Sequence, residues 1–473
     1  MSAGVRQYAQ PNAITVAALF ALRAQADRMS ALRPTEEQAA QGRSTLDVFR
    51  VGRYRLNSMI LDKPIRMKTM CCIAGGGPAG MMLGYLLARA GVEVVVLEKH
   101  ADFLRDFRGD TIHPSTLEVI YELGLLEDFL KRPHQEIREI AGQIGDEMIP
   151  LADFTHLPTQ CKFLAFMPQW DFLDFIKEQA TRYPGFTLKM QAEVTDLIEA
   201  GNSVVGVRAQ TPQGLLEIDA DLTVGADGRK SVVRERGGLQ VQELGAPIDV
   251  LWFRLTRKPT DPGQVLGRFV GGKIMVMLNR ETYWQCGYVI PKGAFEDIKR
   301  SGLDAFRADI TSTAPFLSDR VGELTDWEPI KLLTVMVDRL SQWYRPGLLC
   351  IGDAAHAMSP VGGVGINLAI QDAVAAANIL ARPLSEGWIS PSHLQQVQWR
   401  RELPTRLTQW GQVQVQNRVI GRVLGSNQQV AAPWLIRLFK KYPVLRRIPA
   451  RLIGLGVRPE HVRTEAQVDN LRI

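Results

Sequence analysis

Cysteine is scarce in this sequence, and its spacing excludes two classes of small domain. The chain has 473 residues but only five cysteines, an odd number without a C-x-x-C pair, so neither a disulfide framework nor a zinc knuckle is indicated. The seven histidines show no H-E-x-x-H or comparable metal-ligand spacing. We therefore assign no metal, and we expect a cytoplasmic protein from a reducing compartment.

Long hydrophobic runs are lacking too. The longest nearly uninterrupted apolar stretches, such as residues 14–22, fall far short of the roughly 20 residues that cross a bilayer, so we predict no transmembrane helix. Residues 1–67 lack the apolar region and cleavage site of a secretory signal, and their five acidic residues argue against a transit peptide. We expect a weakly ordered extension here; the alternative is a physiological start at Met59 or Met67.

Positive charge gathers at the two ends of the chain. The net charge is +6, yet residues 1–67 hold ten Lys and Arg against five Asp and Glu, and residues 434–463 hold eight against one, so the middle is mildly acidic. We expect no nucleic-acid partner. Residues 434–463 interleave apolar and basic side chains, which is typical of a segment that lies on an anionic membrane surface. Because Pro443 and Pro449 interrupt it, a pair of short helices packed on the body is the alternative.

A glycine-rich turn between two apolar runs carries the first functional signal. Residues 70–74 read as a strand, 81–90 as a helix and 92–97 as a second strand. The intervening Gly75-Gly76-Gly77-Pro78-Ala79-Gly80 fits G-x-G-x-x-G. The pattern is typical of dinucleotide binding, and an ordinary βαβ unit with a glycine-rich turn is the alternative.

Each glycine of this motif has a physical reason. Gly75 permits the tight turn, Gly77 lets the backbone approach a pyrophosphate, and Gly80 allows close packing of helix and strand. The helix N-terminus offers N–H groups to the phosphates. Glu98 ends the next strand, 18 residues after Gly80, near the spacing of the acid that binds a ribose 2′-OH. NAD and FAD both present these groups, so the motif alone leaves the choice open.

A second glycine cluster favours FAD. An apolar strand, 348–351, ends in Gly352-Asp353, and a glycine-rich stretch, 359–367, opens a long apolar helix. Glycines this dense before a helix let backbone lie against a flat ring and direct the helix dipole at anionic charge on it. Asp353 would accept hydrogen bonds from a hydroxylated ribityl chain.

With these motifs in place, the chain resembles the single-component flavoprotein monooxygenases of the para-hydroxybenzoate hydroxylase type. Besides the first motif, Gly225-Ala226-Asp227-Gly228-Arg229 is similar to the family's DG motif, which serves both FAD and NAD(P)H, and Gly352-Asp353 with residues 360–367 is similar to its GD motif. Their order and spacing agree over about residues 67–385. A lone NAD-dependent dehydrogenase would leave the Gly352-Asp353 cluster unexplained.

The resemblance implies a set of cofactor-binding residues. Glu98 would bind the adenosine ribose, Arg108 would reach the FAD, Gln169 would lie near the cofactor and Asp353 would hold the ribityl chain. The full set is Gly75, Gly77, Ala79, Gly80, Glu98, Lys99, Arg108, Gln169, Asp227, Gly228, Asp353, Gly362, Gly363, Gly365, Ile366 and Asn367. Pro360 would stand on the substrate side of the flavin.

The predicted fold class is α/β, with a Rossmann-type FAD-binding domain, an inserted sheet-rich substrate domain and a helical C-terminal part. We expect the FAD-binding domain at 68–248 and 335–385, the substrate domain at 249–334 and the helical region at 386–473. Ser115-Thr116-Leu117-Glu118 reads as a capping box that opens a helix ending near Gly124.

Candidate walls of the substrate site come from the strands of the inserted domain. The family places the cavity between flavin and sheet domain, which implicates Trp252, Phe253, Arg254, Met275, Met277, Gln285 and Tyr288. Most of these side chains are equally consistent with plain core. Arg254 is a catalytic candidate beside Pro360, because a cation in an apolar strand would pair with a phenolate or carboxylate; a surface salt bridge is the alternative.

The resemblance implies an FAD-dependent monooxygenase that uses NADPH or NADH and O2 to hydroxylate an aromatic small molecule, phenolic, polyketide or prenylated, through a flavin C4a-hydroperoxide. The alternatives are a related flavoenzyme acting on a lipophilic substrate, such as a prenyl reductase or halogenase, and a non-catalytic FAD-binding accessory protein. Halogenases of this superfamily carry W-x-W-x-I-P, whereas residues 286–291 keep only Ile-Pro. A homodimer is a further option.

Overall fold

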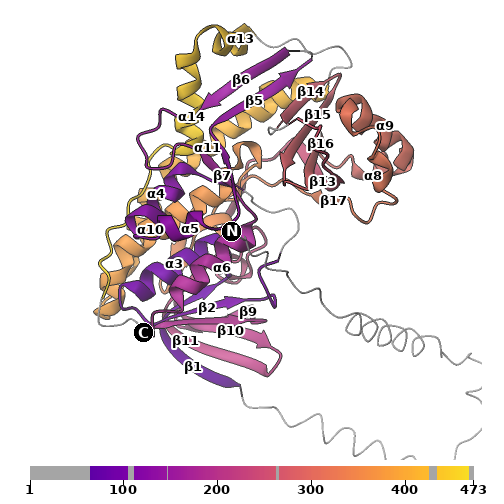
Figure 1. Ribbon diagram of the computed structural model, residues 1–473. Helices are drawn as coiled ribbons and strands as arrows, with labels where there is room; N and C mark the ends of the chain where they lie inside the picture. The colour runs from indigo at the N-terminus through magenta and orange to yellow at the C-terminus, as the bar shows by residue number, and fades with distance from the viewer. Residues whose placement is uncertain (1–63, 105–110, 146, 263–265, 426–433, 468–473) are drawn as a thin grey trace, which may run out of the picture. The chain divides into compact units, whose positions relative to one another are not determined.

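The computed structural model describes residues 64–104, 111–145, 147–262, 266–425 and 434–467 (Figure 1). Within them two large β-sheets carry separate hydrophobic cores, and helices pack on both. The predicted α/β fold, with parallel sheet, second sheet and helical C-terminal region, is confirmed. The predicted extension at 1–67 lies almost wholly outside the described residues.

The first sheet has eight strands and is parallel at its centre. Its strand order is β19-β20-β11-β1-β2-β8, with β10 pairing β11 and β9 pairing β10. β2 is buried at every position, because a strand covered on both faces consists of apolar residues throughout. The strands are β1 (Ile65–Ala74), β2 (Val94–Glu98), β8 (Phe186–Met190), β9 (Glu193–Ala200), β10 (Ser203–Thr211), β11 (Gly214–Gly225), β19 (Tyr344–Arg345) and β20 (Leu348–Cys350).

Three helices pack in succession beside this sheet: α6 contacts α3, and α3 contacts α10. Smaller elements complete this part of the chain, among them a three-stranded sheet of β3, β7 and β4 and a two-stranded sheet of β12 and β18. The bounds are α3 (Pro78–Arg89), β3 (Thr111–Ile112), α4 (Pro114–Glu122), α5 (Leu126–Leu130), β4 (Gln135–Ile137), β7 (Leu164–Phe166), α6 (Gln169–Ala180), α7 (Val232–Arg236), β12 (Val241–Glu243), β18 (Asp338–Leu340) and α10 (Gly365–Ser385).

The second sheet has seven strands in the order β17-β13-β16-β15-β14-β5-β6. Its β5 and β6 come from residues 139–153 and so lie outside the predicted segment 249–334. The elements are β5 (Glu139–Ile144), β6 (Glu147–Asp153), β13 (Ile248–Thr256), β14 (Leu266–Val270), β15 (Lys273–Asn279), β16 (Tyr283–Pro291), α8 (Phe295–Ser301), α9 (Leu303–Thr313), η2 (Pro315–Leu317), η3 (Val321–Glu323) and β17 (Lys331–Leu333).

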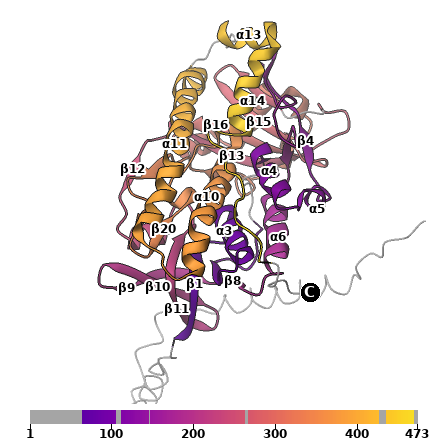
Figure 2. The same cartoon turned by 90° about the vertical axis from the view of Figure 1, so that its left-hand side faces the viewer.

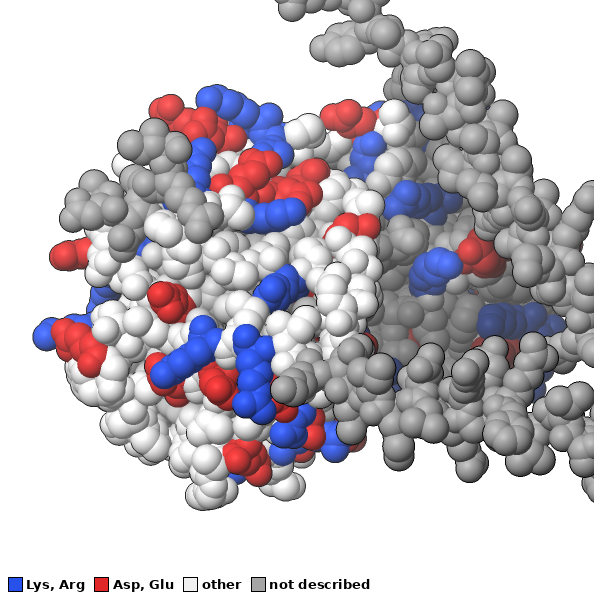
Figure 3. Space-filling view, turned by 90° about the horizontal axis from the view of Figure 1, so that it is seen from below, with Lys and Arg blue, Asp and Glu red and all other residues white. Residues whose placement is uncertain are grey.

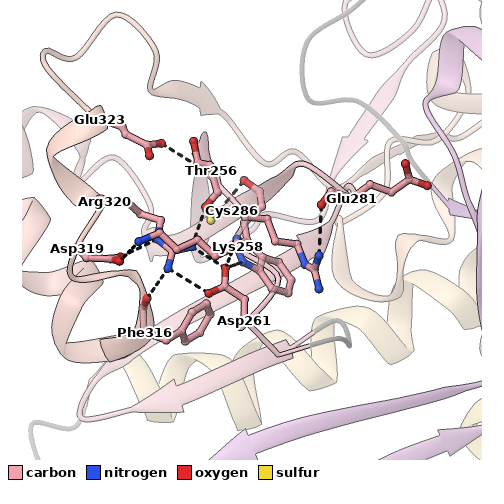
Figure 4. A network of polar contacts seen from close by, with 11 residues as sticks. Thr256, Lys258, Asp261, Glu281, Cys286, Phe316, Asp319, Arg320 and Glu323 are labelled. Atoms are coloured by element: carbon pink, nitrogen blue, oxygen red, sulfur yellow. Dashed lines mark hydrogen bonds and ion pairs between the residues drawn. The ribbon is translucent and has the colours of Figure 1, made fainter.

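One face of the second sheet packs on α8 and α9, and a buried ion pair fastens the end of that layer (Figure 4). Arg320 Nη1 lies 2.6 Å from Asp261 Oδ2, and both side chains are almost fully buried. Trp284 Nε1 and the Lys258 backbone N–H donate to the same carboxylate oxygen. Burial alone would raise the pKa of Asp261, but the Arg320 guanidinium holds it below its usual value. The contacts satisfy both charged groups, so the network is a structural clamp.

The C-terminal part is helical, with α11 running beside α10 (Figure 2). α10 is long and apolar enough to span a bilayer by composition, counted from Val361 to Ser385, yet 78% of that window is buried inside the protein. The other elements are η4 (Gly352–Ala354), η5 (Val361–Gly363), α11 (Pro391–Val415), the π-helical turn η6 (Gln416–Ile420), α12 (Gly421–Leu424), α13 (Trp434–Lys441), η7 (Pro443–Arg446) and α14 (Arg447–Gly454).

The predicted capping box is wrong. α4 has His113 at its N-cap and Pro114 in its first turn, with no side-chain cap. Proline suits the first helical position because its missing N–H is not needed there, so the helix begins one residue earlier. Ser115 is thereby free to donate to Asn367 Oδ1. The predicted end is confirmed, since Gly124 follows the helix with a positive φ of 72°.

Surface charges of both signs are interspersed on the face shown in Figure 3. Several of the described charges form exposed ion pairs, such as Arg208 with Glu217 and Lys131 with Asp128. On this face the described Lys and Arg residues lie among Asp and Glu and form no continuous basic field.

Candidate FAD site

The turn between β1 and α3 is closely packed on one side and open on the other. A Cβ at Gly75 would lie 2.3 Å from the Ala226 carbonyl oxygen, and Gly75 has a φ of 106°. A Cβ at Gly80 would lie 1.9 Å from the Gly75 oxygen. At Gly77 nothing lies within 4 Å of a Cβ position. Two glycines are therefore required by the protein's own packing, whereas Gly77 leaves backbone open to a ligand at the start of α3.

Glu98 lies at the end of β2, next to this turn. Its Oε2 accepts a hydrogen bond from the Gly76 N–H and its Oε1 accepts one from the His100 N–H, each at 3.0 Å. The carboxylate is 8% exposed. A carboxylate oxygen has two lone pairs, so these bonds fix the side chain and leave capacity to accept from a ribose hydroxyl. Lys99, the next residue, is exposed, and Ala79 is buried in α3.

The DG motif meets the GD motif through an ion pair. Arg229 Nε lies 3.1 Å from Asp353 Oδ2, and both side chains are about one third exposed. Gly228 has a φ of 87° and no atom within 4 Å of its Cβ position. Both motifs thus present polar groups and open backbone at the ends of β11 and β20, which are neighbours in the parallel sheet.

Asp227 is partly left over for a ligand. Its Oδ2 accepts from the Val233 N–H, while Oδ1 is buried without a hydrogen-bond partner among the described residues. Burial raises the pKa of this carboxyl above its usual value. A buried polar atom without a partner carries a cost unless something else supplies the hydrogen bond.

The glycine loop before α10 has an unusual backbone. Gly362 and Gly363 have φ angles of 81° and 63°, which favour glycine, and Pro360 precedes them. Asn367 is buried, and its Oδ1 accepts from Ser115 Oγ at 2.7 Å and Thr116 Oγ1 at 2.8 Å. Gly365 and Ile366, in the first turn of α10, are partly exposed.

His113 joins this loop to the C-terminal helix. Its Nε2 lies 3.0 Å from the Gly363 oxygen and its Nδ1 lies 2.7 Å from the Ile453 oxygen. Burial lowers the pKa of His113 below its ordinary value, although both backbone contacts oppose that shift. The end of α14 is thereby fixed next to the loop, and Ser115 Oγ adds a contact to the Gly454 oxygen.

Three glutamines on α11 and η6 hold the backbone that leads into the loop. Gln412 donates to the Ser359 and Val361 oxygens and accepts from the Ser359 N–H. Gln409 donates to the Ala357 oxygen and Gln416 to Ser359 Oγ. Sequence reasoning missed these residues. A signal existed: polar side chains recur at helical spacing along this segment, at 401, 405, 409, 412 and 416.

A buried cluster of charges supports Gly352 from below. Asp372 Oδ1 accepts from Arg401 Nε at 2.9 Å, and its Oδ2 contacts His356 Nε2 at 2.6 Å and the Gly352 N–H at 3.1 Å. Burial alone would raise the pKa of Asp372, but His356 and Arg401 hold it below its usual value. Arg401 also contacts Glu460 near the C-terminus. This cluster too escaped the sequence analysis.

The remaining predicted residues are distributed differently. Gln169 is the first residue of α6 and is partly buried, and Arg108 lies outside the described residues. Arg254 is exposed on β13, with its guanidinium 5.0 Å from the centre of the Tyr283 ring. Pro360 is partly buried beside the loop. The catalytic roles of Arg254 and Pro360 stay predictions.

The second sheet presents two different faces. Four of the predicted wall residues belong to the core under α9: Phe253, Met275, Met277 and Tyr288. The opposite face packs with Val361 of the glycine loop, and Trp252 lies on that face with its ring over Gly287, where a Cβ would come within 3.1 Å of the ring. Trp252 is therefore the predicted wall residue that the fold brings toward the loop.

Taken together, these groups fit FAD. Open backbone at Gly77 suits a pyrophosphate, Glu98 suits a ribose, and Asp353 and the orphaned oxygen of Asp227 suit hydroxyl donors. Open backbone in the glycine loop suits a flat ring.

Comparison with known proteins agrees with this chemistry. The protein family described as FAD binding domain matches residues 68–410. A 6-methylpretetramide 4-monooxygenase from Streptomyces rimosus is 32% identical over 385 residues, covering 80% of this chain and 92% of that protein. A dialkyldecalin synthase from Streptomyces rugosporus is 29% identical, covering 69% and 68%. The structure of p-nitrophenol 4-monooxygenase from Pseudomonas putida matches with a TM-score of 0.66 at 20% identity, covering 83% and 100%.

The chain belongs to this FAD-binding family of flavoprotein monooxygenases. It is an enzyme that depends on FAD, as the resemblance implied.

Proposed function

We propose that the protein hydroxylates a polycyclic aromatic molecule of polyketide type, using O2 and NADPH or NADH. The supporting observation is the similarity to 6-methylpretetramide 4-monooxygenase, which extends over 92% of that protein and so includes its substrate-facing part. Fold-level likeness to nitrophenol and other monooxygenases fits the same chemistry without specifying the substrate.

In this proposal the chain's own residues bind, orient and exclude water. Bound FAD supplies the two-electron redox chemistry and the reaction with O2 that no side chain provides. Glu98 and Gly77 hold the adenosine and pyrophosphate end. Asp353 holds the ribityl chain, and binding there competes with its ion pair to Arg229. The glutamines of α11 fix the loop that faces the ring, so the reacting atoms meet a rigid surface.

The substrate would lie between the glycine loop and the face of the second sheet that carries Trp252. That face is apolar around Val250, Val289 and Ile274, and Val361 of the loop packs against it. An apolar aromatic surface suits a planar polycyclic substrate and limits water near the flavin. Among the described residues, no group in this region is assigned as a catalytic base.

The nicotinamide would bind transiently. The sequence has one G-x-G-x-x-G, and Glu98 beside it is assigned to FAD. A second dinucleotide therefore has no fingerprint of its own, which fits a co-substrate that leaves after reducing the flavin.

A second candidate function has its own support. The dialkyldecalin synthase relative is named for forming a product and not for an oxygenation, and it shares 29% identity over 68% of its length. A protein with this site could thus keep FAD without using it to oxygenate the substrate. The alternatives of a lipophilic-substrate oxidoreductase and a non-catalytic FAD-binding protein belong with this one.

One measurement separates these functions. The purified protein is reduced anaerobically with NADPH or NADH and then mixed with oxygen, with and without tetracyclic aromatic polyketides such as 6-methylpretetramide. The hydroxylase proposal expects flavin reduction that accelerates with the aromatic present, and a product heavier by one oxygen atom. Flavin that neither nicotinamide reduces, or a product of unchanged oxygen content, would refute it and favour the second candidate.

A further inference from the structure

The outward face of α11 carries a stripe of large apolar side chains. Trp399, Leu403, Leu407 and Trp410 are 74%, 56%, 43% and 65% exposed. Their spacing of four, four and three residues places them on one side of the helix. Scattered exposed apolar residues are ordinary, but a continuous stripe with a tryptophan at each end marks a surface that another molecule covers.

The order of these residues is the same in both directions. Reading from either end of the helix gives Trp, Leu, Leu, Trp. When a second copy of α11 runs antiparallel with the twofold axis near residues 404 and 405, Trp399 of one copy faces Trp410 of the other, and Leu403 faces Leu407. An isologous interface needs this kind of self-complementary surface.

The charges beside the stripe follow the same symmetry. Glu402 and Arg406 flank it on one side, and within the chain they form an ion pair with Arg406 Nη1 3.5 Å from Glu402 Oε1. The twofold axis brings this flank of one helix beside the same flank of the other. Glu402 of one copy then lies next to Arg406 of the other, so opposite charges meet on both sides of the axis.

We propose that the protein is a homodimer in which α11 packs antiparallel against α11 of a second copy. An anionic membrane is the less suitable occupant, because both arginines beside the stripe are already neutralised: Arg400 pairs with Glu460 and Arg406 with Glu402. The buried side of α11 is polar and fully engaged with the protein, so the apolar stripe is available only for an external partner.

The first test is the association state of the FAD-loaded full chain, followed by sedimentation velocity over a wide range of concentration. We expect a dimer. Leu403→Ser with Trp410→Ser should raise the dimer dissociation constant at least about a hundredfold, since central aromatic residues dominate interfaces and each is present twice. Trp388→Ser is the matched control, because Trp388 is 49% exposed but lies outside the stripe. Unchanged flavin content and circular dichroism establish that each variant folds.

The second test addresses the antiparallel register. Glu402→Arg or Arg406→Glu alone places like charges together and should weaken the dimer roughly tenfold, whereas the double exchange should restore it. A mixture of Leu403→Cys and Leu407→Cys chains should form an intermolecular disulfide faster than either variant alone. The five native cysteines are buried and do not compete.

Several outcomes would overturn the proposal. They are a monomer at every concentration, a dimer that the stripe variants leave intact, and a double charge exchange that does not restore association. Equally fast self-crosslinking of each cysteine variant would indicate parallel helices. Stripe variants that lose binding to phosphatidylserine vesicles while the wild type is monomeric would assign the stripe to a membrane.

Discussion

Two neighbouring helices, α10 and α11, support the same glycine loops by opposite arrangements of polarity. α10 buries leucine, isoleucine and alanine against the first sheet and α3. α11 buries Arg401, Thr405, Gln409 and Gln412 and exposes Trp399 and Trp410. The difference shows that a helix side can be buried because of what it hydrogen-bonds, and not only because it is apolar.

The arrangement in α11 has a physical reason. The segment from Ala357 to Val361 runs between sheets without forming ladder hydrogen bonds of its own, so its buried backbone groups need side-chain partners. Glutamine has both a donor and an acceptor at the end of a flexible chain, and Gln412 uses both on Ser359. α10, which packs on regular elements, meets no such demand.

Breaking the polar side of α11 should have the largest effect. Arg401→Met leaves Asp372 buried with one cationic partner fewer, which should lower the free energy of unfolding by about 3–5 kcal/mol at neutral pH. The pKa of Asp372 is depressed in the folded protein, so the pair stabilises above the unfolded carboxyl pKa, and this contribution disappears as the pH falls through the lower folded value. Urea unfolding at a series of pH values measures both.

Arg382→Met on α10 is the control, because Arg382 is exposed and pairs only with Glu386 on the surface. It should change the free energy of unfolding by less than about 0.5 kcal/mol. Equal losses for the two arginines, or a loss for Arg401→Met that persists in acid, would contradict the role given to the Asp372 pair.

A matched pair of leucines tests the apolar sides. Leu380 of α10 is fully buried, and Leu380→Ala should lower the free energy of unfolding by about 2–5 kcal/mol. Leu403→Ala on α11 should change it by no more than about 0.5 kcal/mol when measured in dilute, monomeric protein. A large cost for Leu403→Ala under those conditions would mean that the chain itself covers the stripe.

Gln412 links α11 to cofactor binding. Gln412→Met leaves the Ser359 and Val361 backbone groups without their partner, at a cost of about 1–3 kcal/mol, and should weaken FAD binding about tenfold. FAD release followed by fluorescence measures the change. Gln395→Met, at an exposed position of the same helix, is the control. FAD affinity equal to that of the wild type would show that Gln412 does not position the loop.

The sequence carries much of the fold because its strongest signals are local. Apolar runs and glycine turns predict β1, α3, β2, β20 and α10, and glycines with positive φ identify the turns. The capping box failed because Pro114, one residue earlier, competes for the helix start. β5 and β6 join the second sheet through parallel pairing of β5 with β14, a long-range contact that no local pattern encodes.

The site divides in the same way. Glycines and acids that serve a nucleotide appear in short motifs, and Glu98 and Asp353 follow from spacing. His113, Asp372 and the α11 glutamines act across long sequence separations, so only the assembled fold brings them to the loop. The inward polar stripe of α11 is visible in the sequence, but its meaning depends on the neighbour that it faces.

The smallest expected effect concerns a second exposed apolar face, at the C-terminus. On α14, Ile448 and Leu452 are 59% and 56% exposed and lie beside exposed Arg447 and Arg451. Unlike the α11 stripe, this face combines apolar and basic side chains, which fits the predicted contact of residues 434–463 with an anionic membrane. The rest of α14 packs inward through Ala450 and Ile453, so the alternative of packed helices is not contradicted.

Ile448→Ser with Leu452→Ser should leave the free energy of unfolding within about 0.5 kcal/mol of wild type, because both side chains are largely exposed. Co-sedimentation with phosphatidylserine-containing vesicles should fall several-fold, while vesicles of phosphatidylcholine alone bind neither protein. Trp410→Ser, on the charge-balanced stripe, should bind vesicles like the wild type. A wild-type protein that ignores both vesicles would assign α13 and α14 to packing alone, and a loss for Trp410→Ser would join the two apolar faces into one membrane surface.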